Sequence, residues 1–271
     1  MDLKRLAIFG ISGRMGQSIV RALRSETGWC LSGALASPQS PHLGRDAGGA
    51  GTPAAVLITS DPATALIDAH GCKAAVALDF SHAEAVAAHA AACAAAGVPL
   101  LVGTTALQAP GLAALSQAAK SIPILLAPNT SVGVGVLAEL VRFAAGALPQ
   151  DYDVEILEAH HRLKRDAPSG TAIKLGEVVA QARSQELSQA AVYDRHGAQA
   201  LRAPGSIGFS VVRAGDIVGE HTVIFAGTGE RLEITHRATD RDVFARGALK
   251  AAEWLVGRSA GTYSMQDVLR Q

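Results

Sequence analysis

Apolar and polar residues alternate in two different ways along this chain of 271 residues. In the first 129 residues, short and nearly continuous apolar runs are separated by stretches in which apolar residues recur every three or four positions. The runs predict buried strands at 3–9, 30–35, 74–79, 99–102 and 122–127. The stretches between them predict helices at 13–23, 83–96 and 112–120. This order is typical of an α/β fold whose parallel sheet is covered on both faces.

One helix has clear predicted boundaries. Ser81, followed three residues later by Glu84, predicts a capping box at the start of helix 83–96. Gly97 predicts its end.

The pattern changes after about Asn129. Helices are predicted at 134–145 and 172–183, and strands at 154–158, 207–213, 221–226 and 231–238, with a hairpin turn at 227–229. These elements predict an α+β domain with an open, mixed or mainly antiparallel sheet. A last helix, capped by Asp240 or Asp242, runs to Val256. We therefore expect one domain made of 1–129 with 240–271, and a second of 130–239.

The amino-acid composition restricts the binding partners and the cellular compartment that we expect. The 24 basic and 24 acidic residues cancel without forming a long basic run, so neither a nucleic acid nor a membrane is an expected partner. Cys30, Cys72 and Cys93 form no C-x-x-C pair, which favours reduced thiols. No apolar run reaches the roughly 18 residues that span a bilayer. We therefore expect a cytoplasmic protein.

A glycine-rich turn follows the first predicted strand and opens the first predicted helix. Gly10 permits a tight turn, Gly13 lets the backbone approach a pyrophosphate, and Gly16 permits close packing of helix on strand. A glycine triplet alone would also suit an ordinary strand–turn–helix, but its placement favours a Rossmann-type dinucleotide-binding domain. NADPH or NADH would then be held by Gly10, Ile11, Ser12, Gly13, Arg14, Met15 and Gly16.

Further cofactor contacts are predicted where later strands end, because ligands bind open α/β sheets at that edge. The second strand ends near Ala36 and Ser37, without the carboxylate that usually holds the 2′-hydroxyl of NADH. Arg14 can instead face a 2′-phosphate, which favours NADPH slightly or the use of both cofactors. The contacts expected at these strand ends are Ser37, Gly103, Thr104, Thr105, Ala127, Pro128, Asn129 and Thr130.

The segment from Glu158 to Ala172 carries the most specific chemistry. Two histidines and a lysine can transfer protons near neutral pH. A Ser-Gly-Thr turn opens a helix, where main-chain N–H groups can hold an anion. A metal site is not expected, because His-Glu-x-x-His and a cysteine partner are both missing. The segment predicts an acidic substrate that takes up a proton, with candidate residues His160, His161, Lys164, Ser169, Gly170 and Thr171.

These motifs resemble the 4-hydroxy-tetrahydrodipicolinate reductase family, formerly called dihydrodipicolinate reductases. The resemblance covers nearly the whole chain and includes Asp79-Phe80-Ser81, Gly103-Thr104-Thr105, Ser131-Val132-Gly133-Val134 and the segment from Arg213 to His221. It implies reduction of 4-hydroxy-tetrahydrodipicolinate to tetrahydrodipicolinate by NADPH or NADH, in the biosynthesis of lysine and diaminopimelate. It also implies a homotetramer.

The resemblance further implies roles for individual residues. His160 would be a proton donor or acceptor, and Lys164 a proton donor. His161 would contact a carboxylate of the small cyclic dicarboxylate substrate. A carboxylate would also be held by the turn of Ser169, Gly170 and Thr171.

Two other functions remain open from the sequence. One is an imine or semialdehyde dehydrogenase that acts on another small acid. The other is a sensor or assembly protein that binds NAD(P)H without catalysis, although such a protein would be expected to lose His160 or Lys164, and both are present.

Overall fold

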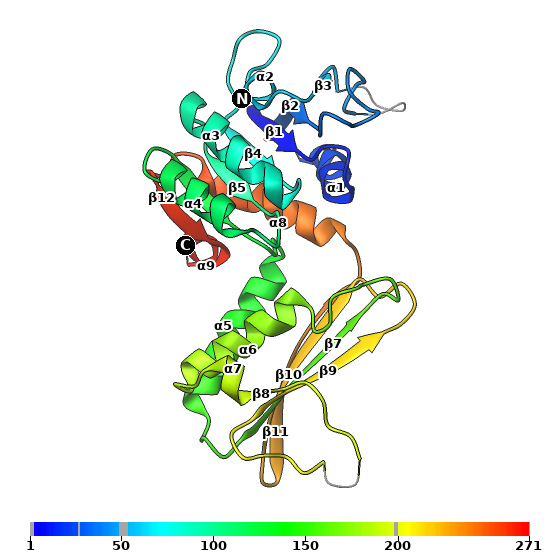
Figure 1. Ribbon diagram of the computed structural model, residues 1–271, viewed down its shortest axis with the longest axis vertical. Helices are drawn as coiled ribbons and strands as arrows, with labels where there is room; N and C mark the ends of the chain where they lie inside the picture. Colours follow the sequence, from blue (N-terminus) through cyan, green and yellow to red (C-terminus); the bar gives the residue numbers. More distant parts are fainter. Residues whose placement is uncertain (1–2, 27, 49–53, 198–199, 271) are drawn as a thin grey trace. The chain divides into compact units, whose positions relative to one another are not determined.

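The computed structural model describes residues 3–26, 28–48, 54–197 and 200–270, and it divides into two compact units (Figure 1). The first unit comprises Met1–Val132 together with Asp242–Gln271, and the second comprises Gly133–Arg241. The chain therefore leaves the first unit once and returns to it with its last long helix.

A seven-stranded parallel sheet forms the centre of the first unit. Its strands are β1 (Lys4–Phe9), β2 (Trp29–Leu35), β3 (Ile58–Thr59), β4 (Val76–Asp79), β5 (Leu100–Val102), β6 (Pro123–Leu126) and β12 (Gly261–Ser264). They lie in the order β12-β6-β5-β4-β1-β2-β3, and their pairings are parallel. Without β12 this is the order 3-2-1-4-5-6 of doubly wound dinucleotide-binding folds, which reverses between β1 and β4.

Helices cover both faces of this sheet (Figure 1). One face packs against α1 (Arg14–Leu23), α8 (Asp242–Leu255) and α9 (Met265–Leu269), and the other against α2 (Pro62–Ala65), α3 (Val86–Ala96) and α4 (Ala109–Ala118). In β1, Leu6 and Ile8 belong to the first core, and Ala7 and Phe9 to the second. Burial on both faces explains why the strands are nearly continuous apolar runs.

The five strands predicted in this half are confirmed as β1, β2, β4, β5 and β6. The short strands β3 and β12 were not predicted. The predicted capping box is wrong: the Ser81 hydroxyl donates instead to Asp79 Oδ1 at 2.6 Å, and a 3-10 turn (Ala83–Ala85) begins after His82. The residue at the N-cap position is His82, so Ser81 lies one residue too early to cap this turn.

The second unit has a five-stranded sheet of β7 (Asp153–His160), β8 (Ala191–Val192), β9 (Ile207–Arg213), β10 (Gly219–Gly227) and β11 (Glu230–Ala238). Their order is β11-β10-β7-β9-β8. β10 pairs antiparallel with β7 and β11, but β9 pairs parallel with β7 and β8. The sheet is therefore mixed rather than mainly antiparallel, because the chain crosses over through helices between β7 and β9.

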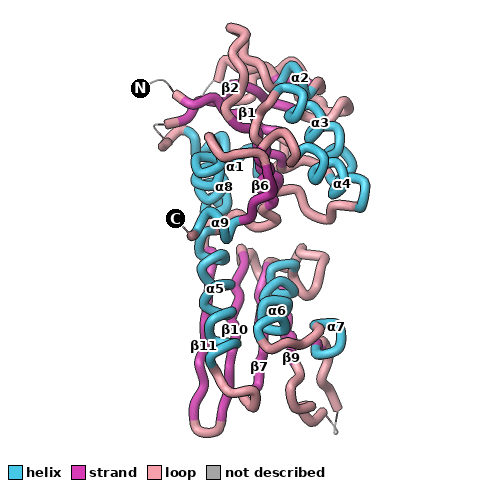
Figure 2. The backbone as a smooth tube through the Cα atoms, turned by 90° about the vertical axis from the view of Figure 1, so that its left-hand side faces the viewer, coloured by secondary structure: helices cyan, strands magenta, loops and turns pink. Residues whose placement is uncertain are grey.

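The helices of this unit are α5 (Val132–Ala147), α6 (Gly170–Ala182) and α7 (Leu187–Ala190). Figure 2 shows α5 and α6 lying along one face of the sheet, where they share an apolar core with its strands. The α/β fold class with a second, open mixed sheet is thereby confirmed.

Strand β7 shows how this core changes into a site. Its alternate residues Val154, Ile156, Glu158 and His160 are buried. Val154 and Ile156 belong to the apolar core. Because side chains alternate between the faces of a strand, Glu158 and His160 lie on the same face one and two repeats further along. The covered face of the sheet thus ends in polar, titratable groups.

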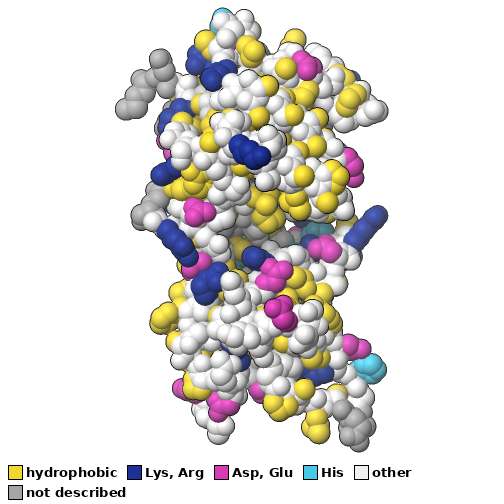
Figure 3. Space-filling model, turned by 60° about the vertical axis from the view of Figure 1, so that its left-hand side comes forward, with side chains coloured by type: hydrophobic (Ala, Val, Ile, Leu, Met, Phe, Trp, Pro, Cys, Tyr) yellow, Lys and Arg dark blue, Asp and Glu magenta, His cyan; other side chains and the backbone are white. Residues whose placement is uncertain are grey.

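Charges of both signs are mixed on the visible face of the protein. Figure 3 shows basic and acidic side chains interspersed on one face of the molecule, in agreement with the equal numbers of the two kinds. Within the described part of the chain, every helix is too short or too polar to cross a bilayer.

Candidate active site

The predicted cofactor contacts lie at one edge of the parallel sheet. The Gly10–Gly16 turn follows β1, Ser37 follows β2, Gly103–Thr105 follows β5, and Ala127–Thr130 follows β6. Parallel strands end at a common edge, so the fold brings these four segments together at the edge where open α/β sheets bind ligands. The strand order reverses between β1 and β4, and the four segments lie around this point of the edge.

The glycine turn has the geometry that its sequence predicts. Gly10 has a φ of 82°, which favours glycine. A Cβ on Gly16 would lie 2.5 Å from the Gly10 carbonyl oxygen, so α1 approaches β1 more closely than a side chain would allow. Ser12, Gly13 and Arg14 are exposed at the start of the helix. Main-chain N–H groups at such a helix start favour an anion.

Two predicted contact residues turn their hydroxyls into the protein. Thr104 is buried and donates to Asp79 Oδ1 at 2.8 Å. Thr130 is 2% exposed and donates to the main-chain oxygen of Phe244, in α8, at 2.7 Å. These hydroxyls hold their loops in place and are not available to contact a cofactor without breaking those bonds.

The end of β2 lacks a carboxylate, as the sequence indicates. Ala36 is 4% exposed and belongs to the apolar core, whereas Ser37 and Arg14 are exposed. A charged side chain is therefore tolerated much better at Ser37 than at Ala36, since burying an unpaired charge is costly.

In the second unit, the end of β7 carries a carboxylate–imidazole pair. Glu158 Oε2 lies 2.6 Å from His160 Nδ1, and both residues are buried. An ionised carboxylate only accepts hydrogen bonds, so we assign the hydrogen to Nδ1 of His160. Nε2 is then the ring nitrogen that carries no hydrogen and can accept a proton. Gly219, beside it on β10, leaves room for the ring, because a Cβ there would lie 3.0 Å from Nε2.

Glu158 also joins the other parts of the site. Arg213 of β9 holds its carboxylate with two hydrogen bonds of 2.7 and 2.8 Å, and the Ser169 N–H donates to it at 2.9 Å. Arg213 further donates to the main-chain oxygen of Asp166 at 2.6 Å. One buried carboxylate thus fixes the imidazole of His160, the start of α6 and, through Arg213, the loop between them.

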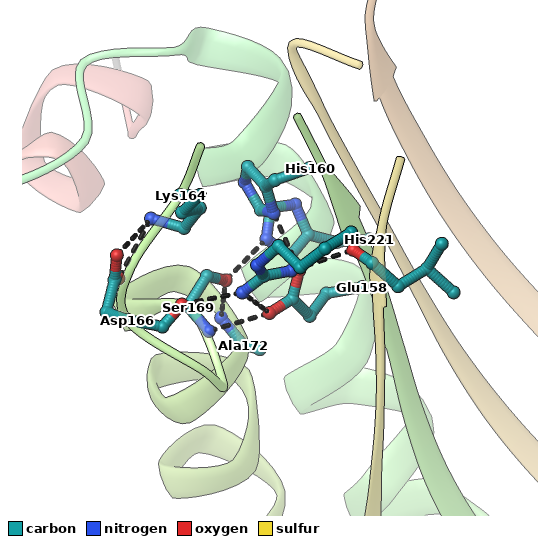
Figure 4. Close-up of polar contacts among 9 residues, drawn as sticks. Glu158, His160, Lys164, Asp166, Ser169, Ala172 and His221 are labelled. Atoms are coloured by element: carbon teal, nitrogen blue, oxygen red, sulfur yellow. Dashed lines mark hydrogen bonds and ion pairs between the residues drawn. The ribbon is translucent and has the colours of Figure 1, made fainter. Parts of the chain in front are cut away.

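Ser169 begins α6 and links it to β10. Its hydroxyl accepts from the Ala172 N–H at 3.2 Å, as expected for an N-cap, and lies 3.0 Å from His221 Nε2. The His160 and His221 rings meet edge to face, with centroids 5.2 Å apart. Figure 4 shows Glu158, His160, Ser169 and His221 turned toward one another.

Lys164 lies on the loop that leaves β7. Its ammonium binds both carboxylate oxygens of Asp166, at 2.9 and 2.8 Å, to one side of the histidine cluster (Figure 4). His161 and Thr171 are half-buried, and Gly170 is exposed at the start of α6. All six predicted substrate residues therefore lie on one strand end, one loop and one helix start.

Burial and charge shift the titration of these groups. Burial raises the pKa of Glu158, but hydrogen bonds from Arg213, His160 and Ser169 outweigh it and hold the pKa below its ordinary value. Burial lowers the pKa of His160, and Glu158 offsets this only in part. Burial, together with the charge of His160, lowers the pKa of His221 to about 4. At neutral pH, Glu158 is therefore ionised and His221 is neutral.

Three residues of this cluster were not among the predicted site residues: Glu158, Arg213 and His221. Glu158 stands two positions before His160 on a strand, so strand periodicity alone places both on one face. Arg213 and His221 are the first and last residues of a segment that contributed to the family resemblance. Their contacts depend on the pairing of β9 and β10 with β7, which sequence periodicity does not reveal.

The 3-2-1-4-5-6 sheet and the titratable cluster of the second unit are features of a two-part α/β oxidoreductase. Family models for dihydrodipicolinate reductase match the chain, the N-terminal model over residues 4–130 and the C-terminal model over residues 133–269. The chain belongs to the dihydrodipicolinate reductase family, which confirms the resemblance seen in its motifs.

Individual relatives agree with this assignment. A protein of Anaeromyxobacter dehalogenans (strain 2CP-1 / ATCC BAA-258) named 4-hydroxy-tetrahydrodipicolinate reductase is 49% identical over 269 residues, 98% of each chain. A protein of that name from Nitrosomonas eutropha is 48% identical over 270 residues, 99% of each chain. A solved dipicolinate-bound dihydrodipicolinate reductase from Paenisporosarcina sp. TG-14 has the same fold, with a TM-score of 0.76 at 22% identity, covering 98% of this chain and 99% of that one.

Proposed function

We propose that this chain reduces 4-hydroxy-tetrahydrodipicolinate to tetrahydrodipicolinate with NADPH or NADH, in the biosynthesis of lysine and diaminopimelate. The ring gains one hydride and one proton and loses its 4-hydroxyl as water, and the cofactor is oxidised. The proposal rests on the grouping of His160, Lys164 and the Ser169–Thr171 turn at the end of β7 and the start of α6 (Figure 4). The chain is also nearly half identical to proteins named for this activity. A protein that only bound the cofactor would not need this group of residues.

We assign the cofactor to the first unit. The glycine turn after β1, the ten-residue helix α1 and the sheet reversal between β1 and β4 fit a dinucleotide, whose pyrophosphate would lie at the start of α1. The Gly103–Thr105 and Ala127–Thr130 loops would flank its nicotinamide ring. When bound, the cofactor supplies the hydride.

We assign proton transfer to His160 and Lys164. Glu158 fixes the orientation of the His160 ring and leaves Nε2 for proton exchange. The nearby charges of Glu158 and Lys164 act on His160 in opposite directions, so its pKa, already lowered by burial, responds to both. Asp166 accepts two hydrogen bonds from the Lys164 ammonium, which leaves its third N–H to donate to the substrate.

The two carboxylates of the substrate require cationic or N–H partners. The start of α6 provides main-chain N–H groups at Gly170 and Thr171, and Ser169 is held as its N-cap. His161, next to His160 at the end of β7, would contact a carboxylate. These groups fit the two carboxylates of the proposed substrate.

The uncovered face of the mixed sheet supports assembly into a homotetramer. Leu157 of β7 and Val212 of β9 lie on this face and are exposed, although each lies in a strand. An apolar, unpartnered sheet face favours contact with a second copy. We further propose that the enzyme works in the cytoplasm, in keeping with its three free cysteines.

Turnover assays with alternative substrates test the proposed function. Initial rates are measured with NADPH and with NADH on 4-hydroxy-tetrahydrodipicolinate, on an amino acid semialdehyde and on an acyclic imino acid. We expect turnover of the cyclic dicarboxylate and at most slight turnover of the others. Preferential turnover of the semialdehyde or the acyclic imine would replace the proposed substrate.

A further inference from the structure

A buried carboxylate–imidazole pair lies in the first unit, outside the cluster described above. Asp79, the last residue of β4, is fully buried, and its Oδ2 lies 2.7 Å from His89 Nδ1 in α3. His89 is 8% exposed and sits among apolar residues of its helix, including Ala90 and Cys93. A buried carboxylate–imidazole pair is weak evidence for a role in stability, since apolar residues of similar volume often serve as well. This pair therefore calls for a role other than stability.

Asp79 fixes the loops that follow two neighbouring strands. Its Oδ1 accepts hydrogen bonds from the Ser81 N–H at 2.9 Å, the Ser81 hydroxyl at 2.6 Å and the Thr104 hydroxyl at 2.8 Å. Its main-chain oxygen accepts from the N–H groups of Gly103, at 2.8 Å, and Thr104, at 3.1 Å. One residue thus holds both the loop after β4 and the loop after β5.

Phe80 extends this arrangement to the glycine turn. Its N–H donates to the Phe9 carbonyl oxygen at 3.0 Å. A Cβ on Gly10 would lie 2.4 Å from the Phe80 carbonyl oxygen, and a Cβ on Gly103 would lie 2.0 Å from the Phe80 ring. Phe80 is therefore packed closely against two glycines of the predicted cofactor loops, so we expect a displacement of Asp79 to affect both loops.

His89 completes the set of donors around this carboxylate. An ionised carboxylate accepts on all sides, whereas a protonated one turns one acceptor into a donor. Burial raises the pKa of Asp79, but His89 and Ser81 outweigh it and hold the pKa below its ordinary value. Loss of the donor at Nδ1 would leave Oδ2 buried without its hydrogen-bond partner, a situation that favours rearrangement of the loop.

We propose that Asp79 and His89 are positioning residues of the cofactor site, which hold the loops after β1, β4 and β5 in the arrangement that receives the nicotinamide end of NAD(P)H. This inference rests on the proposed function, because it needs the cofactor to bind at this edge of the sheet. The pair acts through Phe80, Gly103 and Thr104 rather than by touching the reacting atoms.

His89→Leu and His89→Asn test the proposal as a matched pair. Leucine removes the donor with little change in volume, whereas the asparagine amide can replace Nδ1. The dissociation constant of NADPH is measured by titration without substrate, alongside KM for the dicarboxylate at saturating cofactor. We expect His89→Leu to raise the dissociation constant about 10-fold, equivalent to about 1.4 kcal/mol, with KM for the dicarboxylate nearly unchanged. His89→Asn should restore most of the affinity.

Cys93→Ala provides the control, since Cys93 is buried one turn further along α3. It should lower the unfolding temperature without changing NADPH affinity. An unchanged NADPH dissociation constant in His89→Leu would overturn the proposal, and so would an equal loss of affinity in Cys93→Ala. If His89→Leu does not fold, Ser81→Ala removes a different donor to Asp79, with the same two outcomes. An inactive wild-type protein that binds NADPH would refute the proposed function and leave this test intact.

Discussion

Glu158 and His160 form a hydrogen bond of 2.6 Å between Oε2 and Nδ1, at the buried end of β7. The pair joins a strand that is part of an apolar core to the chemistry that the proposed reaction needs. Glu158 is itself held by Arg213 and by the Ser169 N–H, so the orientation of His160 is set by three separate elements of the fold.

Glu158→Gln should lower turnover and shift its pH profile. The charge and hydrogen bond of Glu158 raise the pKa of His160 against the effect of burial, so their loss lowers that pKa further. The limb of the kcat/KM profile that reports His160 should therefore move to lower pH. We expect kcat to fall by ~10²–10⁴-fold, the range for loss of general acid–base catalysis or of a carboxylate that orients a catalytic histidine. A limb that stays in place would contradict the assignment of His160 as the titrating group.

Lys164→Ala should slow turnover by ~10²–10⁴-fold without weakening NADPH binding, since general acids contribute about this much. Lys174→Ala is the control, because Lys174 is an exposed cation of α6 paired with Glu177.

His160→Gln should lower turnover to a similar extent as Lys164→Ala. In the double variant the two losses should not multiply if both residues serve one proton step. Fully multiplicative losses would show that the two residues serve separate steps. Near-normal turnover of Lys164→Ala would show that Lys164 is not the proton donor.

Gly13→Val should abolish cofactor binding while leaving the protein folded. Gly13 has a φ of −77° that valine tolerates, and a Cβ there would lie 3.2 Å from the Gly10 carbonyl oxygen. The effect is therefore expected from the space that the pyrophosphate needs rather than from backbone strain. Calorimetric titration with both cofactors, with circular dichroism to check folding, measures it. Unchanged affinities would move the dinucleotide away from this turn.

Cofactor preference should depend on two exposed residues, Arg14 and Ser37. Arg14→Ala should weaken NADPH binding more than NADH binding, because a charge-assisted contact with a 2′-phosphate is lost. Ser37→Asp should favour NADH by repelling that phosphate, whereas Ala36 is too deeply buried for the same change. Added salt should weaken NADPH binding more than NADH binding. A wild-type protein that strongly prefers NADH, with no such salt difference, would show that another residue recognises the ribose.

His221 should make the protein sensitive to acid. Its pKa in the folded protein is about 4, below the ordinary value of about 6.5, so only the unfolded chain takes up a proton between these values. Stability should therefore fall as the pH falls from about 6.5 to about 4, by up to about 3 kcal/mol. His221→Gln, which keeps a partner for Ser169, should flatten this fall in urea unfolding experiments. Part of it should remain, because the pKa of His160 is lowered as well. An unchanged pH dependence in His221→Gln would rule out His221 as its source.

Much of the fold could be predicted because its signals are local. The central strands of the parallel sheet are buried on both faces and appear as apolar runs, and the glycine turn between β1 and α1 has a known geometry. Strand β12, of sequence Gly-Thr-Tyr-Ser, has no such signal, since it becomes a strand only by pairing with β6. Likewise, the parallel pairing of β9 with β7 depends on tertiary packing, and the antiparallel expectation for this sheet was only partly right.

In the candidate site, too, local groupings could be predicted from the sequence and contacts between distant residues could not. His160, Lys164 and the Ser169–Thr171 turn lie within one segment, so their sequence spacing brings them together. Glu158 is part of that segment too, but its importance comes from Arg213, which is 55 positions away. The misjudged Ser81 cap has a similar cause, because its hydroxyl binds the buried Asp79 carboxylate, a partner whose burial the sequence does not show.

The proposed reaction delivers one hydride from NAD(P)H and one proton to a cyclic dicarboxylate, whose 4-hydroxyl leaves as water. Product analysis tests it most directly, with purified protein, NADPH and 4-hydroxy-tetrahydrodipicolinate, by comparing cofactor oxidised with tetrahydrodipicolinate formed by mass spectrometry. We predict one tetrahydrodipicolinate for each NADPH oxidised by the wild-type chain, and a rate lowered by ~10²–10⁴-fold in Lys164→Ala. Cofactor oxidation without this product, or equal product formation by Lys164→Ala, would contradict the account.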